Sequence, residues 1–244
     1  MRDILKKDLV LHFGINTLFN MEIADFFFPK TCLACGREGR YLCKECVGKI
    51  PFAQPICPYC KHPSIDGATH ANCVRKLGID GLTSVWEYEG IVRKAVLSLK
   101  FKYATEIGKE ISEYLISSLS GMVLPDVHFL TPIPIYWYRQ NLRGFNQSFE
   151  LGKIVSQAMN WEFAPDLLVK SKSTFSQTEL SRNARRKNLI GSFSLKPVHK
   201  SLVLNFDSVF LFDDVFTTGS TLFEAAKVLK RAGVRKVWGL TVAR

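Results

Sequence analysis

The sequence predicts an α/β protein in which a parallel sheet flanked by helices follows a small cysteine-rich module. Two features predict this fold class. Residues 208–244 have the pattern of a strand, a loop, a helix and a second strand, which is the unit that builds parallel sheets. All seven cysteines lie between Cys32 and Cys73, so the cysteine-rich module precedes most of the chain that would form the sheet.

Composition excludes several classes of protein. Of the 244 residues, 47% are hydrophobic and 23% are charged, which is ordinary for a folded domain and unlike a disordered chain, a collagen or a membrane bundle. No apolar stretch approaches the ~20 residues that a membrane span needs. The N-terminus lacks the apolar block and the cleavage site of a signal peptide, so we expect a cytoplasmic protein.

The formal net charge of +11 favours an anionic partner, such as nucleic acid, a phosphorylated small molecule or an anionic membrane face. The charge is uneven, because residues 171–244 hold 13 of the 33 basic residues but only 5 of the 22 acidic ones. We therefore expect anion binding mainly in the last third of the chain.

Residues 1–28 are expected to form a helical lead. Ile4, Leu5, Leu9 and Leu11 fall near one face of such a helix, and charged residues interrupt them. Packing against the protein's own core explains this face better than attachment to a membrane.

Residues 29–78 are expected to form a double zinc-ribbon module. The segment holds three CxxC pairs and a fourth pair, His70-x2-Cys73, in which histidine replaces the first cysteine. Four thiolate or imidazole ligands suit tetrahedral zinc, and a CxxC turn places two sulfurs on one ion. Sequential pairing gives a first site of Cys32, Cys35, Cys43 and Cys46 and a second site of Cys57, Cys60, His70 and Cys73.

Two structural zinc ions are the expected cofactors of this module, because four protein ligands leave no position for water. The segment is too short to bury a core of its own, so metal binding would supply folding free energy, on the order of 10 kcal/mol per site. Three alternatives stay open: an interleaved pairing, His62 as a ligand in place of His70, and a disulfide scaffold. A cytosolic location and the odd number of cysteines argue against disulfides.

Residues 79–244 are expected to form one α/β domain, for which about 166 residues is a natural size. Apolar periodicity predicts helices over 91–99, 105–120, 146–159 and 221–232. A strand is expected over 128–136, followed by a basic turn. Gly233 stands where a glycine commonly ends a helix, and a further strand is expected over 234–243.

The most informative segment begins at residues 209–212, a continuous apolar run typical of a strand buried on both faces. Asp213 and Asp214 follow directly. The loop after them consists of small polar residues: Thr217, Thr218, Gly219, Ser220 and Thr221. Ligands bind at the carboxyl ends of parallel strands, and helix N-termini bind anions. The loop therefore suits a phosphate, and the two carboxylates suit ribose hydroxyls or a magnesium ion.

This pattern resembles the phosphoribosyl pyrophosphate (PRPP) signature of type I phosphoribosyltransferases over the segment VFLFDDVFTTGST. The resemblance implies a type I phosphoribosyltransferase-like sheet that binds PRPP together with magnesium. It implies that Asp213 and Asp214, as the catalytic pair, hold the ribose 2′ and 3′ hydroxyls, and that residues 217–221 enclose the 5′-phosphate. Two solvated aspartates before an ordinary turn would leave the loop unexplained.

With its cysteine-rich segment, the chain is similar to the ComF family, which includes proteins of bacterial DNA uptake and relatives named GntX. The matching segments are Phe28-Pro29, EYEG at 87–90, LSLKFKY at 97–103, PIPIYWYRQNLRGFNQS at 132–148, and Gln177, Leu180, Arg186 and Asn188 before GSF at 191–193. The chain departs from a full set of eight cysteines at His70. The competence role of the family implies a partner such as a helicase.

The resemblance also assigns the basic turn before the helix at 146–159. Arg143 supplies a rigid fork of donors, and Gly144 lets the backbone approach a ligand. By similarity these two residues bind pyrophosphate, with Arg139 as a second candidate. The alternative is a basic turn on the surface.

Residues 171–188 are polar and basic, and family members place a mobile loop here. The resemblance implies a hood over bound pyrophosphate, formed by Arg182, Arg185, Arg186 and Lys187. A hood that excludes water has a purpose beside a reactive oxocarbenium centre. The same residues could instead form a solvated strip that binds the backbone of single-stranded DNA or of RNA.

Three functions follow from these features. The first is a phosphoribosyltransferase that acts on an unknown acceptor, in DNA uptake or nucleotide salvage. The second is a nucleic-acid-handling protein that keeps the phosphate loop without the chemistry, since fold does not imply function. The third is a ligand-sensing regulator whose zinc module contacts a protein partner.

Overall fold

The computed structural model describes residues 29–99, 104–138, 141, 144–171, 189–196 and 207–244. Contacts within the chain divide it into two units, Met1–Lys49 and Ile50–Arg244. The second set of cysteines therefore groups with the sheet, whereas the expected boundary at residue 78 groups it with the first set. The helical lead expected over 1–28 lies outside the described residues.

The described part of the first unit is a small loop structure around four cysteines. Thr31 and Glu38 form an antiparallel bridge, and helix α2, Lys44–Val47, follows. Arg37 binds both carboxylate oxygens of Glu45, at 2.8 and 3.0 Å. Within residues 29–49, the described part of this unit, few apolar side chains are available beside the cysteines.

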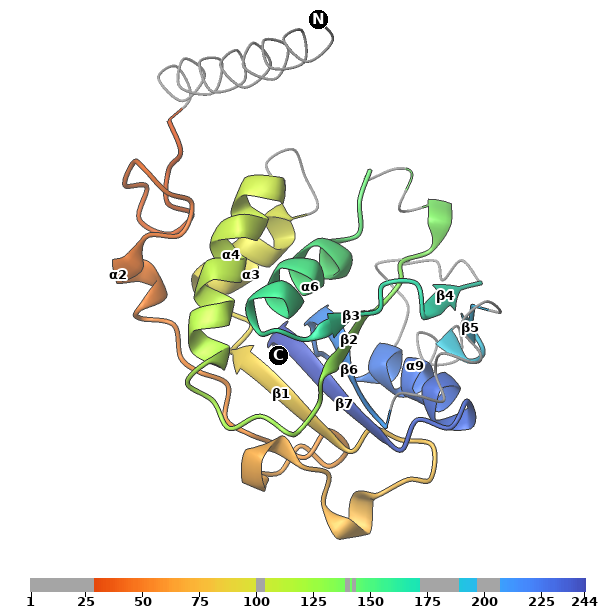
Figure 1. The fold of residues 1–244 in the computed structure, drawn as a ribbon. Helices are drawn as coiled ribbons and strands as arrows, with labels where there is room; N and C mark the ends of the chain where they lie inside the picture. The colour runs from red at the N-terminus through yellow and green to blue at the C-terminus, as the bar shows by residue number, and fades with distance from the viewer. Residues whose placement is uncertain (1–28, 100–103, 139–140, 142–143, 172–188, 197–206) are drawn as a thin grey trace, which may run out of the picture. The chain divides into compact units, whose positions relative to one another are not determined.

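In the second unit, five parallel strands form one sheet in the order β1-β7-β6-β2-β3 (Figure 1). Their bounds are β1 Gly81–Trp86, β2 Phe129–Pro132, β3 Glu162–Phe163, β6 Ser208–Val215 and β7 Lys236–Ala243. A separate antiparallel pair consists of β4, Leu168–Lys170, and β5, Phe193–Leu195.

Among the described residues, four longer helices accompany the sheet: α3 Gly90–Ser98, α4 Ala104–Leu119, α6 Gln147–Ala158 and α9 Ser220–Arg231. Each lies within one or two residues of a helix that the periodicity predicts. Two short 3-10 helices lie near the second set of cysteines: η1 Ile65–Gly67 and η2 Ala71–Cys73. The expected fold class, a parallel sheet flanked by helices after a cysteine-rich segment, is confirmed.

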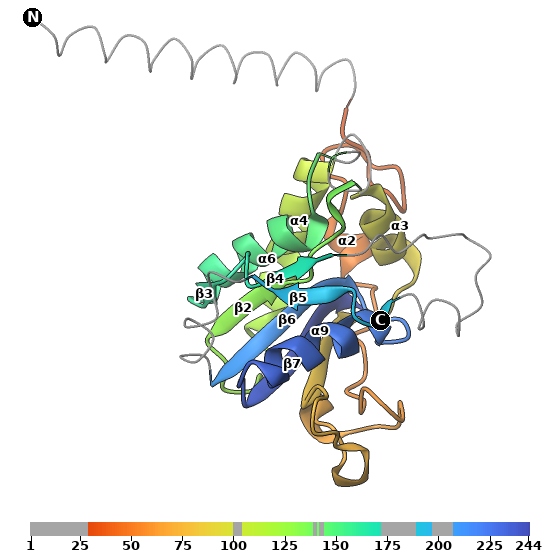
Figure 2. The same cartoon turned by 90° about the vertical axis from the view of Figure 1, so that its right-hand side faces the viewer.

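The helices cover both faces of the sheet, with α4 and α6 on one side and α9 on the other (Figure 2). A Cβ atom built on Gly152 of α6 would lie 3.3 Å from the Phe212 ring, whereas Leu211 packs with Leu222 of α9. Residues 209–212 are consequently 0% exposed. This two-sided burial is the reason why the strand is apolar at every position.

Helix α9 ends at Arg231, and Gly233 stands just beyond its C-cap residue, Ala232, as expected. This glycine has a φ of 107°, which a side chain would disfavour. The N–H of Val234 donates to the carbonyl of Leu229 at 3.1 Å, and the N–H of Gly233 donates to that of Lys230 at 3.2 Å. These bonds satisfy the last carbonyls of the helix and turn the chain back into β7.

Strand β1 has no apolar run because polar side chains at its centre are paired. The Ser84 and Thr241 hydroxyls lie 2.7 Å apart, and the indole N–H of Trp238 donates to Thr83 Oγ1 at 3.0 Å. Such pairing satisfies the hydrogen bonds of the polar side chains buried between β1 and β7.

No helix among the described residues combines the length and the hydropathy that crossing a membrane requires.

Candidate functional site

The acidic pair lies at the carboxyl end of β6, in the middle of the sheet. Asp213 pairs with Thr241 of β7, and Phe216 donates its N–H to the carbonyl of Ala243 at 2.9 Å. The chain leaves the sheet after this bond and enters the loop before α9. The structure thus brings the expected acids and the expected loop to the edge where ligands bind in α/β sheets.

Both carboxylates are held by hydrogen bonds. Asp213 Oδ1 accepts from the hydroxyl of Ser148 at 3.1 Å and from the backbone N–H of Asp214 at 3.0 Å. Asp214 Oδ1 accepts from the N–H of Val215 at 2.7 Å. Ser148 lies in the first turn of α6, so these bonds fix the acidic pair relative to two different elements.

The two carboxylates resist being ionised together. Burial and the neighbouring charge of Asp214 raise the pKa of Asp213 to about 8, although the bonds from Asp214 and Ser148 and the charge of Lys170 oppose the shift. Burial and the charge of Asp214 also raise the pKa of Tyr88. A cation or a hydroxyl donor would relieve the repulsion, so the pair is suited to receive one.

Sequence patterns give no functional role to three residues that influence the acidic pair: Ser148, Lys170 and Tyr88. Ser148 and Tyr88 fall in the segments 132–148 and 87–90, which match the ComF family, so that match was the available signal. No pattern indicated Lys170 of β4, whose charge opposes the rise in the pKa of Asp213.

The loop after the acidic pair requires glycine at one position. Gly219 has a φ of 78°, and a Cβ atom there would lie 2.6 Å from Phe223 and 2.7 Å from Phe216. The Thr218 and Ser220 hydroxyls lie 2.9 Å apart, and the N–H of Ser220 donates to Thr218 Oγ1 at 3.4 Å. The N-cap residue, Gly219, has no side chain that could cap the start of α9. A helix start between hydroxyl side chains can donate hydrogen bonds to a phosphate.

The turn between β2 and α6 lies beside this edge. Ile133 donates its N–H to the carbonyl of Phe212 at 2.8 Å, and the Asn146 amide donates to the carbonyl of Ile133 at 3.1 Å. Asn146 also caps α6 by accepting from the N–H of Ser148. The bond from Ser148 to Asp213 thus places the end of this turn beside the acids.

Gly144 in this turn has a φ of 79° and open space where a side chain would stand. Its backbone angle, and not a close neighbour, is therefore what favours glycine. The other residues expected to bind pyrophosphate or to form the hood lie outside the described residues: Arg139, Arg143, Arg182, Arg185, Arg186 and Lys187.

The structure groups the expected metal ligands in sequential order, as two clusters. Within each cluster the ligand atoms lie within 4.8 Å of one another: Cys32, Cys35, Cys43 and Cys46 in the first, and Cys57, Cys60, His70 and Cys73 in the second. Sulfurs at about 2.3 Å from one zinc ion stand about 3.8 Å apart, and the Cys35–Cys43 distance is 3.8 Å. Both clusters fit a structural zinc ion, and the interleaved pairing is excluded.

His70 completes the second cluster. Its Nδ1 lies 3.3 Å from Cys60 Sγ, and its Nε2 lies 3.0 Å from the carbonyl of Pro63, to which it can donate. A hydrogen bond of this kind fixes the ring orientation of a metal-binding histidine. His62, the alternative, is exposed and lies outside the cluster.

In each cluster, backbone hydrogen bonds lower the pKa of one thiol. Burial raises the pKa of Cys32, but hydrogen bonds from the backbone at Cys35, Cys43 and Ala34 outweigh it and lower the value to about 6. Cys57 is also held at about 6, where burial is outweighed by backbone bonds, chiefly at Cys60 and His70. Zinc binds the thiolate form, so these bonds favour the metal-binding state.

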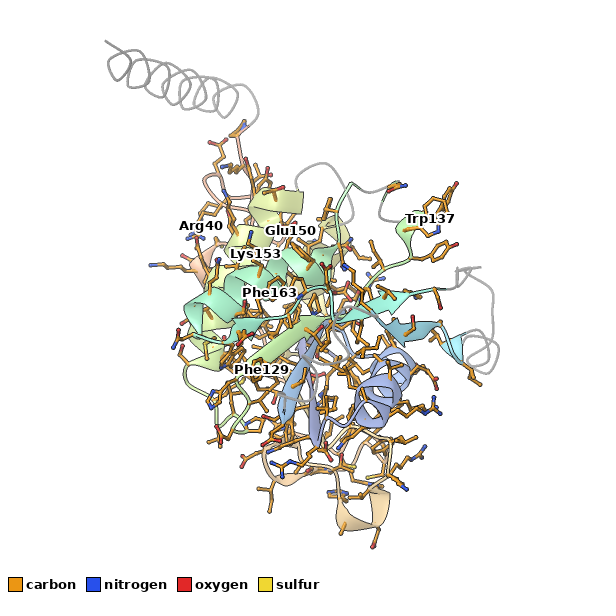
Figure 3. The ribbon with its side chains drawn as sticks, turned by 45° about the vertical axis from the view of Figure 1, so that its right-hand side comes forward. Arg40, Phe129, Trp137, Glu150, Lys153 and Phe163 are labelled. Carbon is orange, nitrogen blue, oxygen red and sulfur yellow. The ribbon has the colours of Figure 1, made fainter. Side chains whose placement is uncertain are left out.

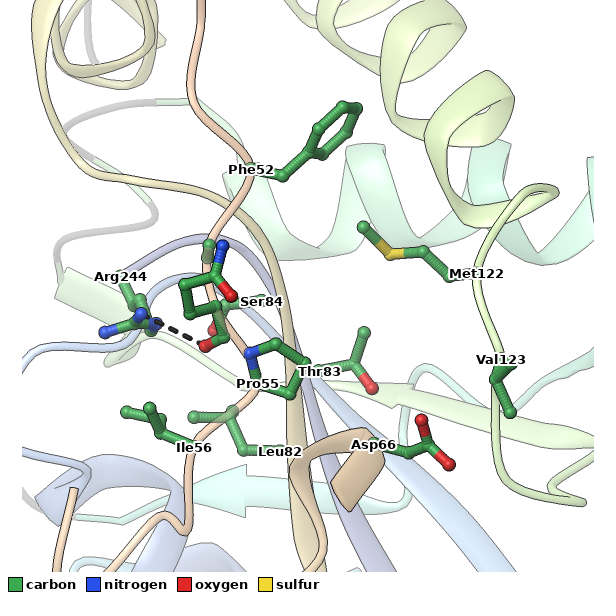
Figure 4. Close-up of a pocket in the computed structure, with 12 residues that line it drawn as sticks. Phe52, Pro55, Ile56, Asp66, Leu82, Thr83, Ser84, Met122, Val123 and Arg244 are labelled. Atoms are coloured by element: carbon green, nitrogen blue, oxygen red, sulfur yellow. Dashed lines mark hydrogen bonds between the residues drawn. The ribbon is translucent and has the colours of Figure 1, made fainter. Parts of the chain in front are cut away.

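A separate cavity of about 270 Å³ lies between the segment 52–56, β1 and the turn at Met122 and Val123 (Figure 4). Arg244 borders it and donates to the carbonyl of Gln54 at 3.1 Å and to Glu87 at 2.8 Å. The last residue of the chain thereby fastens the segment after the first unit to the sheet. The acidic pair does not line this cavity.

Sequence comparisons agree with this arrangement. The family model of the double zinc ribbon domain matches residues 23–74. The chain is 31% identical to competence protein F of Haemophilus influenzae, over 89% of this chain and 99% of that protein. It is 29% identical to the DNA utilization protein YhgH of Escherichia coli K12, over 85% and 92% of the two chains. It is 28% identical to competence protein ComFC of Bacillus subtilis, over 79% of each.

Two solved adenine phosphoribosyltransferases also match. The enzyme of Leishmania donovani shares 13% identity over 56% of this chain and 65% of its own, with a TM-score of 0.26. That of Leishmania tarentolae shares 15% identity over 56% and 71%, with a TM-score of 0.23. Overlaps at this level do not align the two sites.

The sheet topology and the two metal clusters define an α/β protein with a double zinc ribbon. The extent of the match to competence protein F then fixes the family. The chain belongs to the ComF family.

Replacing His70 should remove one zinc ion and leave the other. We expect His70→Ala to bind one zinc per chain, because three ligands hold the ion weakly, and His62→Ala to bind two, like the wild type. Native mass spectrometry of the full chain counts the ions. Two retained ions in His70→Ala would contradict this assignment of the second cluster.

The acidic pair should destabilise the fold as pH rises. Because folding raises the pKa of Asp213 to about 8, the folded chain keeps a proton that the unfolded chain has already released. Asp213→Asn should therefore increase the free energy of unfolding at pH 8.5, by about 1–3 kcal/mol, and this gain should shrink towards pH 5.5. Urea unfolding at several pH values measures it.

Asp207→Asn is the matched control, because this exposed acid stands just before the other end of the same strand. It should give no gain that grows with pH. A gain for Asp213→Asn that stays constant from pH 5.5 to 8.5 would show that ionisation of Asp213 carries no cost.

Proposed function

We propose that the sheet edge after β6 binds PRPP with magnesium and that the protein transfers its phosphoribosyl group to an acceptor. The observation that carries this proposal is the acidic pair, held at the end of a buried strand and followed, after a short loop, by a helix start whose N-cap is Gly219. Hydrogen-bond acceptors and donors therefore lie close together: the carboxylates accept hydrogen bonds, and the start of α9 donates them.

A ribose 5-phosphate matches these acceptors and donors, because its hydroxyls donate hydrogen bonds and its phosphate oxygens accept them. The carboxylates of Asp213 and Asp214 accept hydrogen bonds from the ribose hydroxyls. The 5′-phosphate lies in the loop of residues 217–221, where backbone N–H groups and the hydroxyls of Thr218 and Ser220 donate to its oxygens. The acidic pair and the loop are close in the sequence, so the end of one strand and the start of one helix would hold both parts of the ligand.

The acidic pair also suits a magnesium ion, because hard cations prefer carboxylate and phosphate oxygens. Bound magnesium would neutralise charge on the pyrophosphate. The carboxylates of Asp213 and Asp214 would orient the ribose while the bond from its C1′ to pyrophosphate breaks and the bond to the acceptor forms. Their contribution is placement of the reacting centre and of charge near it.

Pyrophosphate would lie towards the turn between β2 and α6. Gly144 leaves space there, and Arg143 and Arg139 stand beside it in the sequence. Residues 182, 185, 186 and 187 would cover the ligand as a hood. The names of the relatives support a role in DNA utilization or competence.

Binding of PRPP tests the proposal. Titration calorimetry of the full chain with PRPP and Mg²⁺ should show one site, and Asp213→Asn combined with Asp214→Asn should weaken it at least tenfold, because two acceptors of the ribose hydroxyls are weakened. Asp207→Asn should bind like the wild type. The absence of heat with the wild type, or equal binding by the double variant, would refute the proposed site.

A second candidate function, binding of single-stranded nucleic acid, has its own observation. Trp137 and Tyr138, in the turn after β2, are 59% and 54% exposed. The ring centres of Tyr136, Trp137 and Tyr138 follow one another at 5.5 and 6.0 Å, and Figure 3 shows Trp137 on this turn, away from the core. Exposed aromatic rings beside basic residues are typical platforms for unpaired bases.

For this second function we expect labelled oligothymidylate to bind with an affinity that falls as salt increases. Trp137→Ala should weaken binding roughly tenfold, since stacking contributes about 1–3 kcal/mol per base. Val123→Ala, an exposed apolar residue before β2, should have no effect. Fluorescence anisotropy measures both, and equal affinity of Trp137→Ala and the wild type would exclude the platform.

A further inference from the structure

The two CxxC turns that begin the metal clusters have the same backbone. The N–H of Gly36 donates to the carbonyl of Cys32 at 2.9 Å, and the N–H of Lys61 donates to that of Cys57 at 3.0 Å. Both residues follow the second cysteine of their pair, and both are left-handed, with φ of 73° and 65°. The turns are therefore equivalent in the way they hold a metal ion.

The two turns differ in the side chains at the positions that do not bind the metal. Ala34 and Gly36 of the first turn correspond to Tyr59 and Lys61 of the second. A left-handed backbone is unfavourable for any residue with a side chain, and the first turn shows that glycine serves at this place. A lysine kept in such a conformation indicates that its side chain has a use.

Both of these side chains contact the aromatic residues next to the phosphate loop. The Tyr59 ring stacks on Phe223, with ring centres 4.7 Å apart and an angle of 12° between the planes. Lys61 Nζ lies 3.6 Å from the ring centre of Phe216. The hydroxyl of Tyr59 accepts from the N–H of Ile79 at 2.9 Å, which fixes the ring in place.

Phe216 and Phe223 in turn support the loop between them. The two rings meet edge to face, 6.2 Å apart, and close against Gly219 so tightly that a Cβ atom there would lie within 2.7 Å of both. Phe216 directly precedes Thr217, and Phe223 lies in the first turn of α9. Any movement of the two rings would therefore move the loop.

We propose that the second zinc cluster is the support of the phosphate loop: Tyr59 and Lys61, held by the turn at Cys57 and Cys60, fix Phe216 and Phe223 and so order residues 217–222. That the loop binds phosphate rests on the function proposed above. Tyr59 and Lys61 are positioning residues. The first cluster lacks both side chains, so only the second has this role.

Hydrogen–deuterium exchange of the full chain tests the support without any ligand. Lys61→Gly restores the residue of the first turn and should keep two zinc ions, yet exchange of the amides of residues 217–222 should rise roughly three- to thirty-fold, the range that loss of a cation–π contact allows. Tyr59→Leu should act in the same direction. His62→Ala, an exposed neighbour in the same turn, should change nothing.

A matched pair of cysteine variants tests the metal itself. Cys60→Ser and Cys35→Ser each should lose one zinc ion, but only Cys60→Ser should increase exchange in 217–222. Equal exchange in Lys61→Gly, Tyr59→Leu and the wild type would overturn the inference, and so would equal effects of the two cysteine variants. A wild type that fails to bind ribose 5-phosphate would refute the proposed function alone, because the exchange result still decides the support.

Discussion

Strand β6 carries two adjacent carboxylates out of the most buried part of the sheet, and the surrounding structure depends on how their repulsion is managed. Residues 209–212 are enclosed by α6 on one face and α9 on the other, which forces the strand to end at a defined edge. Ser148 and the backbone after Asp213 hold the acids there. A protein selected for stability alone would not keep this pair, which supports the proposed binding site at this edge.

The metal clusters solve a different problem, the shortage of apolar side chains in the cysteine-rich segment. Each cluster brings together four ligands that lie no more than 17 positions apart in the sequence, so metal binding substitutes for a core. The second cluster belongs to the unit of the sheet. Its turn carries Tyr59 and Lys61 against Phe223 and Phe216, the aromatic residues that flank the loop after β6.

Local sequence patterns predict the parts of the fold in which burial alone, or metal-ligand spacing alone, determines the residue types. Residues 209–212 read as a buried strand because both faces are covered, and His70 was found because its spacing repeats that of the cysteine pairs. Strand β1 was missed because Thr83 and Ser84 are buried as partners of β7, which no local pattern reveals. Ser148 contacts Asp213 across 65 positions of the chain, and Tyr59 meets Phe223 only in the folded state.

The proposed function requires that residues 217–221 receive the phosphate of a ribose 5-phosphate. The most direct measurement follows the backbone amide resonances of the ¹⁵N-labelled full chain while ribose 5-phosphate is added. We expect the largest shifts at Thr217 to Thr221, because in the proposed complex their N–H groups donate to the phosphate. Shifts confined to other parts of the chain, or no saturable shift in the loop, would contradict it.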